Sequence, residues 1–132
     1  MKMKSEIKVY FRIVGFPMSP EVLTDKLGLK PTDTWKKGDA GRIAKTTFKN
    51  NGWELSSGLN KSVDLKTHVG TLLDNITPFK KNFVKVCSEY PPDLICVVYS
   101  YGGDRPAIVF ERDIIKELTE LNASIDVDLY VL

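Results

Sequence analysis

The sequence predicts a single α+β domain over residues 1–132, with a mainly antiparallel sheet of about six strands and helices mostly on one face. Three observations support this fold class. The chain has 132 residues, of which 42% are hydrophobic and 27% charged, which suits one globular domain. Segments with strand-like alternation occur between segments with helix-like periodicity. Each predicted helix carries one apolar stripe, as helices that cover one side of a sheet do.

Strict alternation predicts the first and last strands. Residues 7–14 and 124–132 place apolar side chains at every second position, as in a strand with one buried face. Residues 94–101 begin with an unbroken apolar run, which indicates a strand in the middle of the sheet. An Asn-Gly pair at residues 51–52 is typical of a hairpin turn. Three weaker strands are predicted at residues 42–48, 53–55 and 107–110.

Helix boundaries are predicted from capping residues. Ser19 and Pro20 suit the start of a helix over residues 20–27, because a serine oxygen accepts hydrogen bonds from free backbone N–H groups and proline fits the first helical position. Gly28 suits its end, since glycine readily adopts the left-handed conformation. Apolar stripes predict three further helical segments, at residues 62–76, 79–89 and 111–121.

The composition favours a cytoplasmic protein. No apolar run approaches the roughly 20 residues of a membrane-spanning helix, and the basic start is not followed by the apolar segment of a signal peptide. Cys87 and Cys96 are then expected to be buried free thiols. The net charge of +2 is too small to favour nucleic acid as a partner, and no membrane partner is expected.

The charges are unevenly distributed along the chain. Residues 1–50 carry a net charge of +6, whereas residues 51–132 carry −4. A surface divided in this way can dock a partner of either sign or associate with itself head to tail as a homodimer. The alternative is two solvated faces without a partner.

The sequence offers no recognisable catalytic centre. His68 is the only histidine, and it is expected on a helix surface or boundary without a nucleophile beside it. A hydrolase would need a pocket that joins His68 to Cys87 or Cys96. A single histidine and two separated cysteines cannot form a structural zinc site. We therefore predict no enzymatic activity, no metal and no cofactor.

The most unusual segment spans residues 35–42. It combines an aromatic ring, cations and a Gly-Asp turn: Trp35, Lys36, Lys37, Gly38, Asp39 and Arg42. Tryptophan is typical of protein interfaces, and loop N–H groups beside Lys36, Lys37 or Arg42 can bind an anion. The alternative is a solvated turn over a packed Trp35. At least one of Trp35 and Trp53 is expected to be half-buried or more, and both are candidate binding residues.

The last strand provides a second candidate contact surface. Asp126, Asp128 and Tyr130 share the face opposite to the apolar side chains. A cation such as Mg²⁺ would need a third ligand there, for example Asp104, but sites for hard cations usually contain more clustered oxygen atoms. The preferred interpretation is a solvated or ion-paired strand face, which is also a candidate surface for contact with a protein partner.

Several short motifs in a fixed order resemble a bacterial family named domain of unknown function 4279. They lie at residues 11–15, 19–23, 27–31, 35–39, 53–55 and 125–130. The resemblance covers nearly the whole chain and implies a small cytoplasmic protein of a family without an established enzymatic activity. Families of this size often include immunity proteins, which neutralise toxins from neighbouring cells; this step is an analogy.

These observations lead to two functional hypotheses. The first is a non-enzymatic binding protein with a protein partner, in particular an immunity-type inhibitor that binds a toxin domain. The alternative is a module that binds a small ligand or an anion through residues 35–42.

Overall fold

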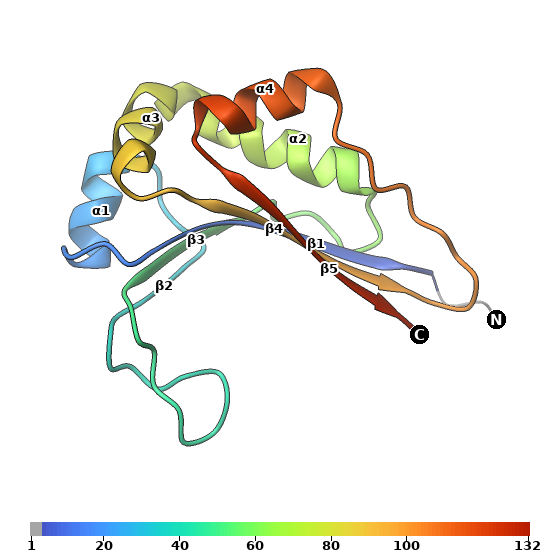
Figure 1. Cartoon of the computed structure of the whole chain (residues 1–132), viewed down its shortest axis with the longest axis horizontal. Coiled ribbons are helices and arrows are strands. Elements are labelled where there is room, and N and C mark those ends of the chain that lie inside the picture. The colour runs from blue at the N-terminus through green and yellow to red at the C-terminus, as the bar shows by residue number, and fades with distance from the viewer. Residues whose placement is uncertain (1–3) are drawn as a thin grey trace.

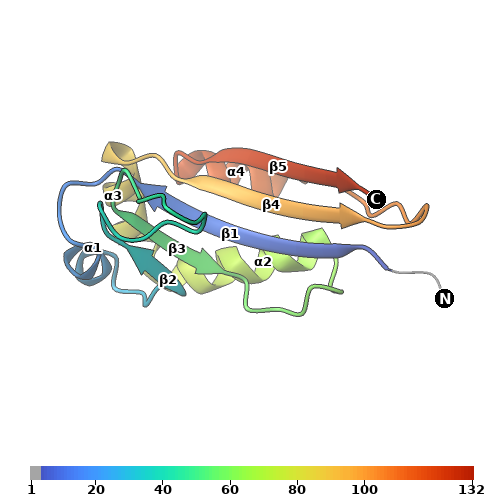
Figure 2. The same cartoon turned by 90° about the horizontal axis from the view of Figure 1, so that it is seen from below.

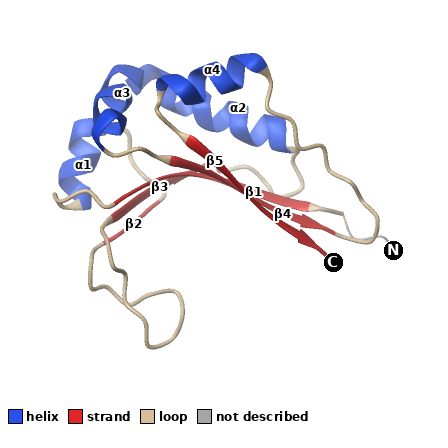
Figure 3. Ribbon diagram, viewed as in Figure 1, coloured by secondary structure: helices blue, strands red, loops and turns tan. Residues whose placement is uncertain are grey.

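The structure is a computed structural model that describes residues 4–132. Within these residues one sheet of five strands lies beneath a layer of helices (Figures 1 and 3), which confirms the α+β class. The strands are β1 (Glu6–Val14), β2 (Asp33–Trp35), β3 (Gly52–Ser56), β4 (Asp93–Ser100) and β5 (Ser124–Val131). The helices are α1 (Pro20–Leu27), α2 (Leu65–Ile76), the 3₁₀ helix η1 (Thr77–Phe79), α3 (Lys80–Glu89) and α4 (Arg112–Glu120).

The sheet is mixed rather than purely antiparallel. Its strand order is β2-β3-β1-β4-β5, which can be followed from below in Figure 2. β1 pairs antiparallel with both β3 and β4, and β2 pairs antiparallel with β3. The chain leaves β4, crosses the sheet through α4 and returns as β5, so β4 and β5 run parallel. A helix is the usual connection between neighbouring parallel strands.

Strand β1 organises the core because it lies at the centre of the sheet. Ile7, Val9, Phe11 and Ile13 point to the helical side and are buried. The ring of Phe83 on α3 meets the rings of Phe11 and Trp53 edge to face, both at centroid distances of 5.8 Å. Removal of each such large apolar side chain from water contributes about 1.5–3 kcal/mol.

Local capping fixes the ends of α1 as the sequence indicates. The hydroxyl of Ser19 accepts a hydrogen bond from the N–H of Val22, and Gly28 ends the helix with a φ of 83°. Asp64 caps α2 in the same way by accepting from the N–H of Thr67. The predicted helix over residues 20–27 is confirmed, and the other three agree to within a few residues.

The prediction of about six strands is wrong. Within residues 42–48 only Thr47 forms a bridge, an isolated one to Ala40, and residues 107–110 form a loop. A strand that is not predicted from the sequence, β2, is present instead. The Asn-Gly pair makes no tight hairpin and lies instead at the end of the long connection from β2 to β3. There the side chain of Asn51 donates to the carbonyl groups of Phe16 and Met18, which fixes the end of this connection.

β4 is an interior strand between β1 and β5, as the apolar run predicts, although β1 is the third of the five strands and so the central one. The apolar run of β4 has its helical side fully buried, while Val97 and Tyr99 on the other side are only half-buried. The long run therefore reflects a strand with partial cover on its second face, not one enclosed between two layers.

Both cysteines are buried free thiols, as predicted. Burial raises the pKa of Cys87 to about 12, and burial together with the charges of Asp126 and Asp128 raises the pKa of Cys96 to about 12. The thiols are therefore protonated at neutral pH, and a protonated thiol is a poor nucleophile.

The packing around Trp53 gives a first prediction. Trp53→Ala removes a fully buried ring and leaves a cavity beside Phe83, so the free energy of unfolding should fall by roughly 3–5 kcal/mol. Urea titration followed by circular dichroism measures this change. Ile43→Ala is the matched control, because Ile43 is exposed and its loss should change stability by less than about 0.5 kcal/mol. Equal effects of the two variants would contradict the assigned core.

Candidate contact surface on the open face of the sheet

The face of the sheet away from the helices carries most of the predicted site residues. No helix of the described chain covers this side (Figure 1), and we call it the open face. Alternation along β1 sends Lys8, Tyr10 and Arg12 to it. The strand register then places Glu54 beside Arg12, and Asp33 beside Glu54. Polar side chains from neighbouring strands are thus brought together on one surface.

Trp35 is the centre of an aromatic and cationic group on the open face. Its ring stacks on Phe48, with 5.0 Å between centroids and 22° between planes. The guanidinium carbon of Arg42 lies 5.0 Å from the centroid of Trp35, and that of Arg12 lies 5.7 Å away. We call these residues together with Glu54 the Trp35 cluster. Trp35 is only 8% exposed, so the expectation of a largely buried tryptophan is confirmed.

Glu54 holds the Trp35 cluster together electrostatically. Its Oε1 accepts from Nη2 and Nε of Arg12 at 2.6 and 2.9 Å, and its Oε2 lies 3.6 Å from Nη2 of Arg42. Arg42 also lies 3.5 Å from Asp33. Because Glu54 is only 5% exposed, loss of either arginine would leave a buried carboxylate with weaker compensation.

A glycine makes room for the Trp35 ring. Gly52 is the register partner of Trp35 on β3. A Cβ atom at Gly52 would overlap the indole atoms Cε2, Cζ2 and Nε1 of Trp35. The ring therefore lies directly over the backbone of β3, and Gly52 is required for this packing.

The segment of residues 36–51 joins β2 to β3 and projects from the sheet on the open side (Figure 1). Its predicted binding residues are held by bonds within the segment. The N–H groups of Lys36, Lys37, Gly38 and Asp39 donate to the Asp39 side chain, the Asn51 side chain, the Phe48 carbonyl and the Lys36 carbonyl, respectively. None of these four N–H groups is free to bind an anion.

The other half of the open face is acidic and rich in tyrosine. The ring of Tyr99 stacks on Tyr130 at 4.9 Å and lies 6.5 Å from Tyr101. Asp126 and Asp128 precede Tyr130 on β5 and are exposed. No lysine or arginine among residues 4–132 lies within 4.0 Å of either carboxylate. We call these five residues the acidic tyrosine patch.

Trp53 does not belong to this surface, contrary to its selection as a binding residue. It points to the helical side, is fully buried, and its Nε1 donates to the hydroxyl of Thr24 at 3.2 Å. The reason is the two-residue period of β3, which sends Trp53 and Glu54 to opposite faces.

His68 is buried instead of lying at a helix surface or boundary, which corrects the expectation from the sequence. It is 1% exposed, and its Nδ1 lies 2.6 Å from Oγ of Ser57, which is also buried. Burial lowers the pKa of His68, while the carbonyl group of Asn60, the charge of Asp64 and the carbonyl group of Val63 oppose that change. No sequence signal points to this pair, because Ser57 directly follows a strand end and belongs to no motif.

The Ser57–His68 pair fits a structural tie better than a nucleophile and its base. Within residues 4–132 the second imidazole nitrogen has no hydrogen-bond partner, so no carboxylate orients the ring. A cavity of about 470 Å³ adjoins the pair. Neither Cys87 nor Cys96 lines this cavity, so the arrangement that would indicate a hydrolase is not formed there.

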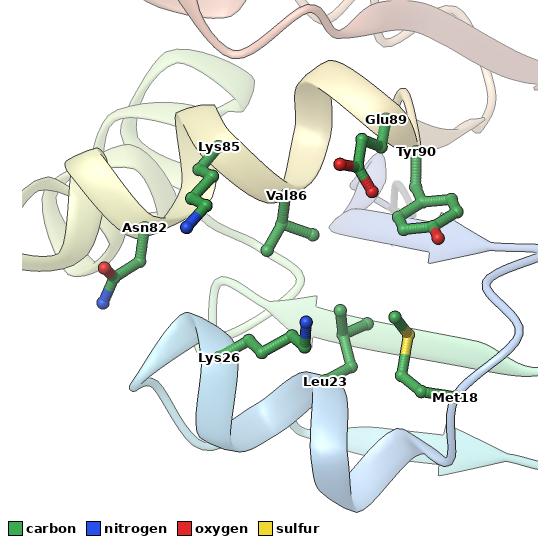
Figure 4. Close-up of a pocket in the computed structure, with 8 residues that line it drawn as sticks. All are labelled: Met18, Leu23, Lys26, Asn82, Lys85, Val86, Glu89 and Tyr90. Atoms are coloured by element: carbon green, nitrogen blue, oxygen red, sulfur yellow. The ribbon is translucent and has the colours of Figure 1, made fainter.

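A groove of about 290 Å³ lies between α1 and α3, away from every predicted site residue. In Figure 4, Lys26 on α1 lies beside Leu23, and Lys85 on the facing α3 lies beside Val86. Glu89 lies towards one end of the groove, beside Tyr90.

The comparison with protein families agrees with the resemblance noted above. The family described as a domain of unknown function (DUF4279) matches residues 5–132. The chain belongs to this family. No curated protein and no solved structure matches it significantly.

Residues 4–132 contain no helix with the length and apolar character needed to cross a bilayer. Nor do they contain three or more His, Cys, Asp or Glu side chains placed to hold a metal ion.

The contact between Gly52 and Trp35 gives a second prediction. Gly52→Ala should displace the Trp35 ring from β3, lower the free energy of unfolding by roughly 1–3 kcal/mol, and expose the indole to iodide quenching. Gly70→Ala in α2 is the matched control, since a Cβ there meets open space and should raise stability by up to about 1 kcal/mol. Unchanged quenching in Gly52→Ala would show that the ring does not lie on β3.

The buried histidine gives a third prediction, on pH. Because burial lowers the pKa of His68, the unfolded chain binds a proton more readily than the folded one, and stability should fall as pH drops below about 6.5. His68 is the only histidine, so His68→Gln should remove this dependence between about pH 6.5 and 5. Urea titrations at a series of pH values measure both slopes. Equal slopes in the wild type and the variant would refute the assignment.

Proposed function

We propose that this chain is a non-enzymatic binding protein of the bacterial cytoplasm and that its partner is a protein with a basic surface. The acidic tyrosine patch carries this proposal. Asp126 and Asp128 have no cationic neighbour within ion-pairing distance in the described chain, and they lie beside stacked tyrosine rings on a face without helical cover.

The chemistry of the patch suits protein recognition. Tyrosine gives a large contact area at a small cost in side-chain entropy and can donate a hydrogen bond through its hydroxyl. Carboxylates without a bound cation attract a basic partner and orient it during approach. The stacking of Tyr99 between Tyr101 and Tyr130 limits the freedom of the rings before binding, which reduces the entropy lost on association.

An immunity-type inhibitor of a bacterial toxin is the specific form of this proposal. A toxin that acts on nucleic acid must attract phosphate groups with lysine and arginine. An acidic surface with aromatic anchors would occupy the same cations and block access of the substrate. The Trp35 cluster lies on the same open face, so Lys36 and Lys37 at its margin would contact acidic residues around the basic centre of the partner.

The alternative, anion binding by residues 35–42, has less support from the geometry. The loop N–H groups donate within the segment, and Arg42 is engaged by Glu54 and Asp33. An anion would have to displace these carboxylates from the guanidinium group.

A binding experiment with charge reversal tests the proposal. Wild-type protein and the variant Asp126→Lys/Asp128→Lys, each immobilised, are exposed to lysate of the source cell. We expect one stoichiometric protein on the wild type, with capture reduced on the order of tenfold or more by the variant and weakened by salt. Tyr130→Ala should also reduce capture, because it removes a half-exposed ring from the patch.

Asp25→Lys/Asp74→Lys is the matched control for charge. It makes the same change in net charge at exposed positions on α1 and α2, so capture should persist. A partner retained equally by both double variants would contradict the assigned surface, and no stoichiometric partner at all would contradict the function.

A further inference from the structure

One edge of the sheet is long and unpaired. β5 has eight residues and pairs only with β4, and Figure 2 shows no described element beyond it. The opposite edge, β2, has three residues. A long free edge exposes a row of N–H and C=O groups that can pair with another strand.

The hydrogen bonds at both ends of β5 show which backbone groups form this row. The N–H of Ser124 donates to the carbonyl of Pro92, and the N–H of Leu132 donates to the carbonyl of Ser100. Successive residues of a strand direct their backbone N–H and C=O groups to opposite sides. The N–H and C=O groups of the even-numbered residues of β5 therefore point to β4. The N–H and C=O groups that point outward therefore belong to Ile125, Val127, Leu129 and Val131.

The same odd-numbered residues carry apolar side chains on the helical side of the sheet. Leu129 is 51% exposed and Val131 is 76% exposed. Ile115 on the adjacent α4 is also exposed. α4 therefore leaves the second half of β5 uncovered, and the free edge is bordered by apolar surface.

We propose that two copies of this chain associate through antiparallel pairing of their β5 strands about a two-fold axis at Leu129, which joins the two sheets into one of ten strands. At this register Leu129 faces Leu129 of the second copy, and Val127 faces Val131. These three pairs are of the hydrogen-bonded kind, since their N–H and C=O groups all point outward.

Charge selects this register among the alternatives. An axis at Val127 would place Asp126 opposite Asp128 of the second copy, and an axis at Asp128 would place that carboxylate opposite itself. Like charges directly opposite each other destabilise a strand pair. An axis at Leu129 instead places Asp128 opposite Tyr130. An axis beyond these positions would leave fewer residues paired between the two β5 strands. A slip by one residue would place the apolar face of one strand on the same side as the polar face of the other.

The resulting dimer should be weak and reversible. A seam of one strand pair and its adjoining side chains is smaller than the roughly 1,200–2,000 Å² of a stable interface. We therefore expect dissociation in the micromolar to millimolar range. The two open faces would lie on the same side of the joined sheet, because a two-fold axis normal to the sheet preserves its sides.

Sedimentation equilibrium over a concentration series tests the association. We expect a monomer–dimer equilibrium for the wild type, and Leu129→Asp should raise the dissociation constant at least about tenfold, since it places two carboxylates at the axis. Val22→Asp is the matched control, because Val22 is an exposed apolar residue on α1 and should leave the equilibrium unchanged. Thermal unfolding checks that all variants are folded.

Cysteine cross-linking tests the register independently of stability. Leu129→Cys should form a disulfide between copies under mild oxidation, whereas Val127→Cys should not, because residue 127 faces residue 131. The native cysteines are buried and serve as the internal background. A monomer at every concentration, a dimer unaffected by Leu129→Asp, or preferential cross-linking at residue 127 would each overturn the proposal. These results do not depend on capture of a heterologous partner.

Discussion

The two-sided character of β1 is the constraint on which the rest of the structure depends. Its central position requires one face to be apolar, and Ile7, Val9, Phe11 and Ile13 meet that requirement under the helices. All four α-helices of the described chain lie on that side (Figure 1), so the alternate residues face a surface that no helix covers. The open face must therefore be stabilised by ion pairs between its side chains or by packing of the segment of residues 36–51 against it, and both occur.

The Trp35 cluster shows how that stabilisation works. A carboxylate as buried as Glu54 is costly unless its oxygens are matched by donors, and Arg12 and Arg42 provide them from β1 and from the segment of residues 36–51. The same guanidinium groups lie over the Trp35 ring, where a cation–π contact at a partly exposed site contributes about 0.5–1 kcal/mol. One carboxylate thus couples the projecting segment to the central strand, so the shape of the open face depends on it.

The elements that can be predicted from the sequence are those whose determining contacts are local. The ends of α1 follow from Ser19 and Gly28, which act within one turn of the helix. Elements that depend on pairing between residues far apart in the sequence are not predicted. β2 exists because Trp35 packs over Gly52 across a long connection, and a three-residue strand has no periodicity to detect. Strict alternation is also a local signal, and it predicts that Asp126, Asp128 and Tyr130 share a polar face. The Ser57–His68 pair joins a strand end to a helix, and no local signal predicts it.

The parallel β4–β5 pair links the open face to the free edge. A hairpin between β4 and β5 would have made the two strands antiparallel and would have required no helix between them. In that case α4 would not lie over the sheet. As a result of the crossover, β5 has one neighbouring strand, β4, and is only partly covered by α4. Leu129 and Val131 are therefore exposed beside an acidic face. Carboxylates at an edge discourage indiscriminate strand pairing, yet they permit registers that separate them. The open face and the free edge of β5 lie at right angles to each other on the same strand. In the two proposals, the acidic residues therefore contribute both to recognition of a basic partner and to the choice of register in self-association.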